Sequence, residues 1–310
     1  MSGVARLIAD GGTSAREAEF FRSTEFLEAE GVTHTLEVEV DGGVLKAPLI
    51  VNSIEGGGQD AISPYGYPGV GGGAGVRVDP SSVDFSETGL VTIFIRHRLD
   101  EVSFHSTRER NLVFVADPSM DRYSRPQDRQ QVKRNTENGF ETEILHGPDT
   151  PASDREGFAR VYTETMERRK AKDRYFYPDA YFARILQSEQ SHLAVTCDGD
   201  GEVAAASIVV LSDGFLHYYL TGSSEARWEE SPTKNLVTAL VDWSYELGLP
   251  LSLGGGIKED DDKLAMFKRG FSNRTERWQT SEIVCNEEAY ARLSSANTPD
   301  GFFPAYREPQ

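Results

Sequence analysis

Hydrophobic and polar residues alternate over residues 34–40 with the period of two that β-strands have. Residues 34–40 read HTLEVEV, and residues 41–43, Asp-Gly-Gly, form a turn signal ahead of the apolar segment VLKAPLIV. Two such segments joined by this turn predict a β-hairpin. Further strands are expected at about residues 90–95 and 112–115.

Two helices and one long loop are predicted in the same part of the chain. Ser14 and Glu17 have the spacing of a capping box, so we expect a helix that runs to about Glu30. Residues 126–137 form a basic helical segment that ends at an Asn-Gly pair. Residues 55–75 contain nine glycines and the sequence SPYGYPG. This composition excludes a regular element, and its aromatic residues favour an ordered loop.

The second half of the chain gives a clear order of elements. The segment 232–248 has a proline in its first turn and an apolar stripe at helical spacing, which predicts an amphipathic helix. The pattern as a whole predicts the order β, α, α, β, β, β, α, β, α, β. Strands are expected at about 140–145, 192–197, 203–211, 215–221, 249–254 and 276–285, and helices from 153 onward, at 179–187, at 232–248 and around Lys268.

Composition places the chain among proteins with packed cores. It has 310 residues, of which 38% are hydrophobic, and a chain of this length is expected to form two domains or one large one. Apolar runs stay short of the roughly 20 residues that span a bilayer, and the N-terminus lacks a secretory pattern, so we expect a cytoplasmic protein. Cys197 and Cys285 match no metal-ligand spacing, so no metal and no disulfide framework is expected.

The formal net charge of −18 argues against a protein that coats nucleic acid nonspecifically, because phosphate binding needs a local excess of Lys and Arg. Residues 122–134 and 155–174 are nevertheless locally basic. Two interpretations remain open at this point. These segments form a restricted basic surface on an acidic body, or they are the solvated faces of two helices.

The segment 250–271, PLSLGGGIKEDDDKLAMFKRGF, carries the strongest candidate chemistry. It predicts a short buried strand, three glycines at 254–256 and a helix that contains Lys268. Glycines let a ligand approach the backbone, and a lysine supplies a mobile charge for an oxyanion or a phosphate. The alternative is an ordinary turn followed by a solvated lysine.

The order of elements resembles the GNAT acyltransferase fold, and several motifs narrow the match. The chain looks like the branch that contains the Fem nonribosomal peptidyltransferases, which pair two GNAT-like domains and move an aminoacyl group from a charged tRNA to an amine. The motifs that carry this resemblance are SPYGYPG, RQQVKRNTENG at 129–139, the Arg-rich helix at 162–172, LGGG at 253–256 followed by Phe267-Lys268, and FFPAYR at 302–307.

The resemblance implies a mixed α/β (α+β) fold with two tandem GNAT-like domains. Each domain is expected to hold a mixed, mostly antiparallel sheet flanked by helices. The expected limits are residues 1–145 for the first domain and 146–286 for the second, with residues 287–310 packing back on the first. A monomer and a dimer are both compatible with this arrangement.

One departure from the acyl-CoA enzymes bears on the donor. GNAT enzymes that use acyl-CoA carry a glycine-containing loop after the fourth strand, whose backbone N–H groups hold the pyrophosphate. Here residues 225–234 contain no glycine, and Glu229 and Glu230 would repel a pyrophosphate. This favours aminoacyl-tRNA as co-substrate, with no separate cofactor. A donor such as acetyl-CoA, another acyl-CoA or a carrier protein is the alternative, and a noncatalytic GNAT-like binding module is the third interpretation.

The resemblance also assigns roles to residues. Lys268 is expected to meet the oxyanion or the terminal phosphate, and Asp60 and Tyr65 to position the acceptor amine of a cell-wall precursor or small metabolite. The alternative for Asp60 and Tyr65 is a role in holding their loop. His217 is interpreted as a packed strand residue. The expected substrate-binding residues are Tyr67, Tyr219, Gly254, Gly255, Gly256, Phe267 and Arg307, and the expected tRNA-phosphate contacts are Arg129, Lys133, Arg134, Arg168, Arg169, Lys170 and Arg274.

Overall fold

The computed structural model describes residues 3–72, 76–99, 103–104, 107–256, 262–294 and 302–307. The chain forms two compact units, residues 1–110 with 277–310 and residues 111–276. The limits of these units differ from the predicted limits at 145/146 and 286/287. The reason is that the segment after residue 110 supplies strands that pair with strands of the second unit, including β8 (Glu141–His146), which lies against β9 (Ser191–Cys197).

The first unit is built on a mixed, mostly antiparallel sheet. The predicted hairpin is confirmed, because β2 pairs antiparallel with β3 from His34↔Leu49 to Val40↔Gly43. Two neighbouring pairs in this unit, β1 with β5 and β4 with β6, are parallel. The strands, in spatial order, are β5 (Val83–Asp84), β1 (Gly3–Ile8), β2 (His34–Val40), β3 (Gly43–Ser53), β4 (Gln59–Ile62), β6 (Thr92–Arg96) and β13 (Arg274–Val284).

The predicted N-terminal helix from Ser14 is wrong. The Asp10 carboxylate accepts hydrogen bonds from the backbone N–H of Ser14 at 2.7 Å and of Gly12 at 2.9 Å, which holds this segment in a turn. The helix α1 (Thr24–Ala29) begins only after Ser23, whose hydroxyl accepts from Phe26 N at 3.2 Å. The N-cap is therefore nine positions later than the capping-box pattern indicated.

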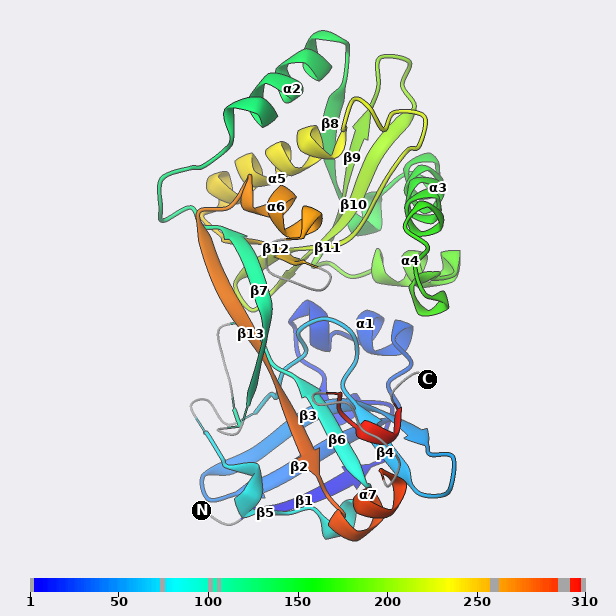
Figure 1. The fold of residues 1–310 in the computed structure, drawn as a ribbon, viewed down its shortest axis with the longest axis vertical. Helices are drawn as coiled ribbons and strands as arrows, with labels where there is room; N and C mark the ends of the chain where they lie inside the picture. Colours follow the sequence, from blue (N-terminus) through cyan, green and yellow to red (C-terminus); the bar gives the residue numbers. More distant parts are fainter. Residues whose placement is uncertain are drawn as a thin grey trace. The chain divides into compact units, whose positions relative to one another are not determined.

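The second unit confirms the predicted order of strands and helices. Its strands, in spatial order, are β7 (Arg108–Ala116), β12 (Leu251–Gly255), β11 (Phe215–Ser223), β10 (Val203–Ser212), β9 and β8. Its helices are α2 (Pro126–Glu137), α3 (Ala152–Arg168), α4 (Asp179–Ile185), α5 (Thr233–Leu247) and α6 (Lys263–Arg269). Helices α3 and α4 lie on one side of this sheet, and α2, α5 and α6 lie on the other (Figure 1).

Close helix–sheet packing fixes both layers of the second unit. On one side, the α5 residues Leu236 and Leu240 are fully buried in a core cluster. On the other side, a Cβ at Gly222 of β11 would lie 2.4 Å from Val161 O of α3. The absence of a side chain at this position lets the α3 backbone rest against the strand.

The C-terminal residues of the described chain belong to the first unit. Helix α7 (Glu287–Leu293) supplies Tyr290, and its ring lies 6.0 Å from the ring of Phe303, which in turn stacks on Phe94 of β6 at 6.5 Å. Aromatic contacts of this kind bury apolar area that would otherwise face water. Among the described helices, none combines the length and the apolar character needed to cross a membrane.

Candidate functional site

Lys268 lies at the centre of the candidate site in the second unit. Helix α6 is capped by Asp262, whose carboxylate accepts from Leu264 N and Ala265 N at 2.9 Å each, and this fixes the helix that carries the lysine. The Lys268 side chain is 9% exposed, and its Nζ donates to the carbonyl oxygen of Gly255 at 2.8 Å. The ammonium group is therefore held at the end of β12, as an inward-facing lysine and not as a solvated one.

The glycine that precedes this contact is matched to the lysine. Gly254 has a φ of +72°, a backbone conformation that L side chains rarely adopt. A Cβ at this position would lie 3.1 Å from Lys268 Nζ. The glycine thus allows the backbone to turn at this position and leaves room for the ammonium group of Lys268.

Burial changes the acid–base character of Lys268. Removal from water lowers its pKa to about 8, and the nearby Asp262 carboxylate opposes this shift. The side chain is mostly protonated at neutral pH and close to its titration point. A buried ammonium can stabilise an oxyanion more strongly than one in water, because the surroundings screen its charge less.

The strands β11 and β12 stop pairing before either of them ends. The parallel ladder between β11 and β12 contains only the pairs Leu216↔Leu251 and His217↔Ser252, although β11 continues to Ser223. A β-bulge follows on β11, where Tyr219 is the extra residue between two positions that pair with β10. A bulge re-aims a side chain. The hydroxyl of Tyr219 lies 3.0 Å from that of Tyr181 on α4.

The N-terminus of α5 is closed by α2. The Asn135 Nδ2 group of α2 donates to Asn235 Oδ1 at 2.7 Å and to Glu230 O at 2.8 Å. Two backbone N–H groups in the first turn of the helix are used within the chain itself, because Lys234 N donates to Ser231 O and Asn235 N donates to Pro232 O. The N–H groups of Lys234 and Asn235 are therefore not available to an anion.

A buried ion cluster strengthens this connection between α2 and α5. The Asp128 side chain of α2 is 1% exposed, and it lies 2.7 Å from Arg125 Nε and 3.1 Å from Lys234 Nζ. Lys234 is thus engaged by a carboxylate at the place where an acyl-CoA enzyme would hold a pyrophosphate. The sequence pattern missed Asp128 and Asn135 as interface residues because α2 has almost no apolar stripe.

The predicted phosphate contacts fall into two groups that the structure does not bring together. Arg129, Lys133 and Arg134 are exposed on α2, whereas Arg168, Arg169 and Lys170 end α3 on the opposite side of the sheet (Figure 1). Lys133 lies 3.7 Å from Glu137. Arg274 on β13 forms ion pairs with Asp117 and with Glu276.

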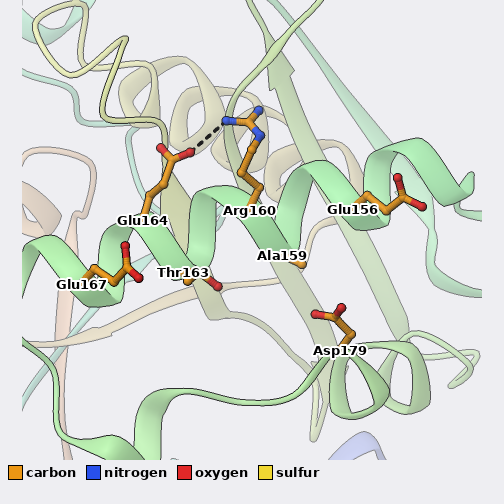
Figure 2. Close-up of a pocket in the computed structure, with 7 residues that line it drawn as sticks. All are labelled: Glu156, Ala159, Arg160, Thr163, Glu164, Glu167 and Asp179. Carbon is orange, nitrogen blue, oxygen red and sulfur yellow. Dashed lines mark hydrogen bonds and ion pairs between the residues drawn. The ribbon is translucent and has the colours of Figure 1, made fainter.

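The outer surface of α3 ahead of Arg168 is acidic. Figure 2 shows a shallow pocket in which Glu156, Glu164 and Glu167 follow one another along α3, with Asp179 at the start of α4. Arg160 is paired with Glu164 at 3.1 Å. Carboxylates outnumber the one arginine, so this pocket does not suit an anionic ligand.

Asp60 and Arg307 of the first unit are bound to each other. Arg307 Nε lies 2.6 Å from Asp60 Oδ2, its Nη2 lies 2.9 Å from Oδ1, and Nη2 also donates to Ser53 O at 2.8 Å. The Asp60 side chain is only 6% exposed. Both carboxylate oxygens are therefore engaged by a bidentate arginine, and an amine would have to compete with it.

The prediction that residues 55–75 contain no regular element is wrong, because residues 59–62 form β4. The SPYGYPG loop that follows is ordered, as its aromatic residues indicated. Carbonyl oxygens along it accept from three arginines: Ser63 O from Arg96 at 2.5 Å, Pro68 O from Arg22 at 2.8 Å and Val70 O from Arg98 at 3.4 Å. Nothing in the loop's own sequence indicates these distant partners. One buried guanidinium group, that of Arg22, and two partly buried ones thus satisfy carbonyl oxygens that have no regular hydrogen-bond ladder.

The two tyrosines of this loop have different surroundings. Tyr65 is 44% exposed, and its backbone N–H donates to Glu30 Oε2 at 2.9 Å. The Tyr67 ring packs edge-on against Phe21 at 5.8 Å and Trp278 at 6.1 Å, and burial raises the pKa of its phenol. Tyr65 is therefore the tyrosine of this loop that is open to solvent.

The remaining predicted residues lie near the second-unit core. Phe267 is half-buried, with its ring 5.3 Å from that of Phe271. His217 on β11 is buried, its Nε2 lies 3.3 Å from Ser212 O, and burial lowers its pKa to about 4. It is a packed strand residue, as predicted. Gly255 has no room for a side chain, because a Cβ there would lie 2.7 Å from Leu112 O.

Comparison with known proteins agrees with this geometry. Residues 124–264 match the family model of the acetyltransferase (GNAT) domain, and no curated protein matches the chain. FemX has a similar structure, with a TM-score of 0.61 and 11% identity over 87% of this chain and 93% of that one. L-PGS from Bacillus licheniformis gives a TM-score of 0.57 and 14% identity over 84% and 86%.

A third similar structure is the C-terminal domain (DUF2156) of a putative lysylphosphatidylglycerol synthetase from Agrobacterium fabrum. Its TM-score is 0.57, with 12% identity over 91% of this chain and 92% of that one. At these identities the likeness is one of fold. It covers most of both units, and together with the family model it confirms the resemblance to the GNAT acyltransferase fold that the order of elements predicted.

Proposed function

From the GNAT acyltransferase domain that residues 124–264 contain, we propose that this protein transfers an aminoacyl group from aminoacyl-tRNA to an amine and so forms an amide bond. The donor is bound through the acceptor end of the tRNA. The acceptor is a small amine-bearing molecule or a cell-wall precursor. The reaction needs no covalent enzyme intermediate.

The observation that carries this proposal is that two side chains of α2, Asn135 and Asp128, engage residues at the N-terminus of α5. Acyl-CoA enzymes of this fold need free backbone N–H groups there for the pyrophosphate. In this chain the Asn135 side chain donates hydrogen bonds to Asn235 and Glu230 at that helix end, and the Asp128 carboxylate forms an ion pair with Lys234. Glu229 and Glu230 add negative charge at the same place. A donor that does not place a pyrophosphate at this helix end fits these residues better than coenzyme A.

The proposed chemistry is aminolysis of an ester. The acceptor nitrogen attacks the carbonyl carbon of the aminoacyl ester, and the carbonyl oxygen becomes an oxyanion that the Lys268 ammonium stabilises. Collapse of the tetrahedral species breaks the ester C–O bond and releases the ribose hydroxyl of the tRNA, which takes up the proton that the amine loses. The burial of Lys268 supports this role over a noncatalytic binding module.

The test is a release assay with labelled aminoacyl-tRNA pools and a set of amine acceptors, run beside acetyl-CoA. We expect enzyme-dependent loss of label from tRNA that requires the acceptor, and no release of thiol from acetyl-CoA. Lys268→Ala should lower the rate of release on the order of a hundredfold, which separates catalysis from spontaneous ester hydrolysis. Thiol release without tRNA turnover would instead establish the acyl-CoA alternative.

A further inference from the structure

Trp228 is an exposed tryptophan on a fixed loop of the second unit. It lies between β11 and α5, and its side chain is 51% exposed. Its backbone N–H donates to Glu225 O at 3.2 Å, and its carbonyl accepts from Ser231 N at 3.2 Å. The preceding residue, Arg227, binds Asp198 at 2.7 Å. The indole is therefore presented by a loop that is anchored on both sides, the usual setting of a recognition residue.

Arg168 supports the indole from one face. Its Cζ lies 4.5 Å from the centroid of the Trp228 ring, which is a cation–π contact. Its Nη2 donates to Thr165 Oγ1 at 3.2 Å and to Ser223 Oγ at 3.1 Å. Its Nε and Nη1 are closed to solvent and have no hydrogen-bond partner among the described residues. The aromatic ring is thus the principal contact for that side of the guanidinium.

The charges around Trp228 select the kind of ligand. Glu225, Glu229 and Glu230 share its loop, and the Glu164 carboxylate accepts from Glu225 N at 2.8 Å. A phosphate placed directly on this loop would be repelled, whereas a neutral planar group would not. The exposed cations that end α3 and follow it, Arg169 and Lys170, provide charge for a phosphate attached to that planar group.

We propose that Trp228, supported by Arg168, is a stacking platform for an unpaired adenine nucleotide. One face of the ring is occupied by the guanidinium, and the exposed half of the side chain is available to a second planar group. Aromatic residues next to cations are how proteins hold single-stranded nucleotides without reading their sequence. The inference rests on the proposed function, because the adenine would come from the terminal adenosine of the aminoacyl-tRNA. Coenzyme A carries the same base and is the other source.

The test is binding of a short single-stranded RNA ending in CCA to the full chain, measured by anisotropy, with coenzyme A in a parallel arm. Trp228→Ala should weaken RNA binding on the order of tenfold to a hundredfold, as expected when one stacked base no longer has its partner. Trp228→Tyr should retain most of the affinity, because a phenol ring also stacks. Tyr123→Ala, which removes another exposed aromatic of this unit at 48% exposure, is the matched control and should leave binding unchanged.

A second measurement tests the platform if the alanine variant folds poorly. It compares how far the RNA quenches tryptophan fluorescence in the wild type and in Trp228→Phe. Unchanged RNA affinity in Trp228→Ala, together with unchanged quenching in Trp228→Phe, overturns the platform. Trp228-dependent binding of coenzyme A but not of RNA supports the platform and contradicts the tRNA donor. Trp228-dependent RNA binding without aminoacyl transfer also supports the platform, and it is the proposed function that then fails.

Discussion

Lys268 places a positive charge inside the protein, where its ammonium group contacts the carbonyl of Gly255 and lies next to Gly254. We predict that Lys268→Ala lowers the single-turnover rate of transfer on the order of a hundredfold, about 3 kcal/mol, with little effect on substrate binding. Lys268→Arg should rescue poorly, because a planar guanidinium cannot replace a compact ammonium beside Gly254. Near wild-type rates in both variants would remove Lys268 from the mechanism.

The pKa of Lys268 gives the same hypothesis a pH dependence. The transfer rate of the wild type should fall as the pH rises through about 8, because the ammonium loses its proton there. The residual activity of Lys268→Arg should lack this decline, since a guanidinium stays charged. Rate profiles of the two proteins across this pH range check this, and identical profiles would assign the decline to another group.

Stability should move in the opposite direction from activity. The folded-state pKa of about 8 lies below the ordinary value of 10.5, so the unfolded chain binds this proton more tightly. The burial therefore costs stability, about 3 kcal/mol at neutral pH, and this cost is relieved as the pH rises from 8 towards 10.5. Lys268→Met, a variant that removes the charge and keeps the volume, serves as the stability control and should be at least as stable as the wild type at neutral pH.

At the scale of elements, the two basic groups on α2 and α3 lie on opposite sides of one sheet, so they cannot contribute equally to one tRNA complex. We predict that substitution to Ala of Arg169 and Lys170 flattens the dependence of tRNA binding on salt, with the slope falling by about one for each phosphate that is no longer bound. The paired substitution of Lys133 and Arg134 is the comparison. Titrations at several salt concentrations measure both slopes, and a salt-independent affinity would contradict the tRNA donor.

The elements of the second unit could be predicted because each has its own local signal. The Asp-Gly turn at 198–201 separates β9 from β10, and the proline at 232 marks the start of α5. The structure of the segment after Ser14 could not be predicted in this way, because the Asp10 carboxylate competes for the N–H groups that a helix would use. The sequence pointed to Lys268, but Asp60 and Arg307 are 247 positions apart, and no local pattern predicts their pairing.

At the scale of the whole chain, the ion pair between Asp60 and Arg307 fastens the last described residues to the first unit. We predict that Arg307→Ala lowers the free energy of unfolding by about 3 to 5 kcal/mol, because it leaves a buried carboxylate unpaired. Lys133→Ala removes an exposed pair of helix α2 and should cost no more than a few tenths of a kcal/mol. Denaturant unfolding of both variants makes the comparison, and equal costs would show that the pair contributes little.

The path of the chain through its two units also sets an order of events during synthesis. Residues 111–276 are contiguous, so the second unit has all its strands as soon as they leave the ribosome. The first unit has to wait for β13, which pairs with β6 from Thr280↔Arg96 to Val284↔Thr92, and for Arg307. Until then the edge of β6 is open to unwanted pairing with other strands. A chain cut short before residue 284 would therefore hold a finished second unit and an unfinished first one, with an aggregation-prone edge on β6 that β13 covers in the full chain.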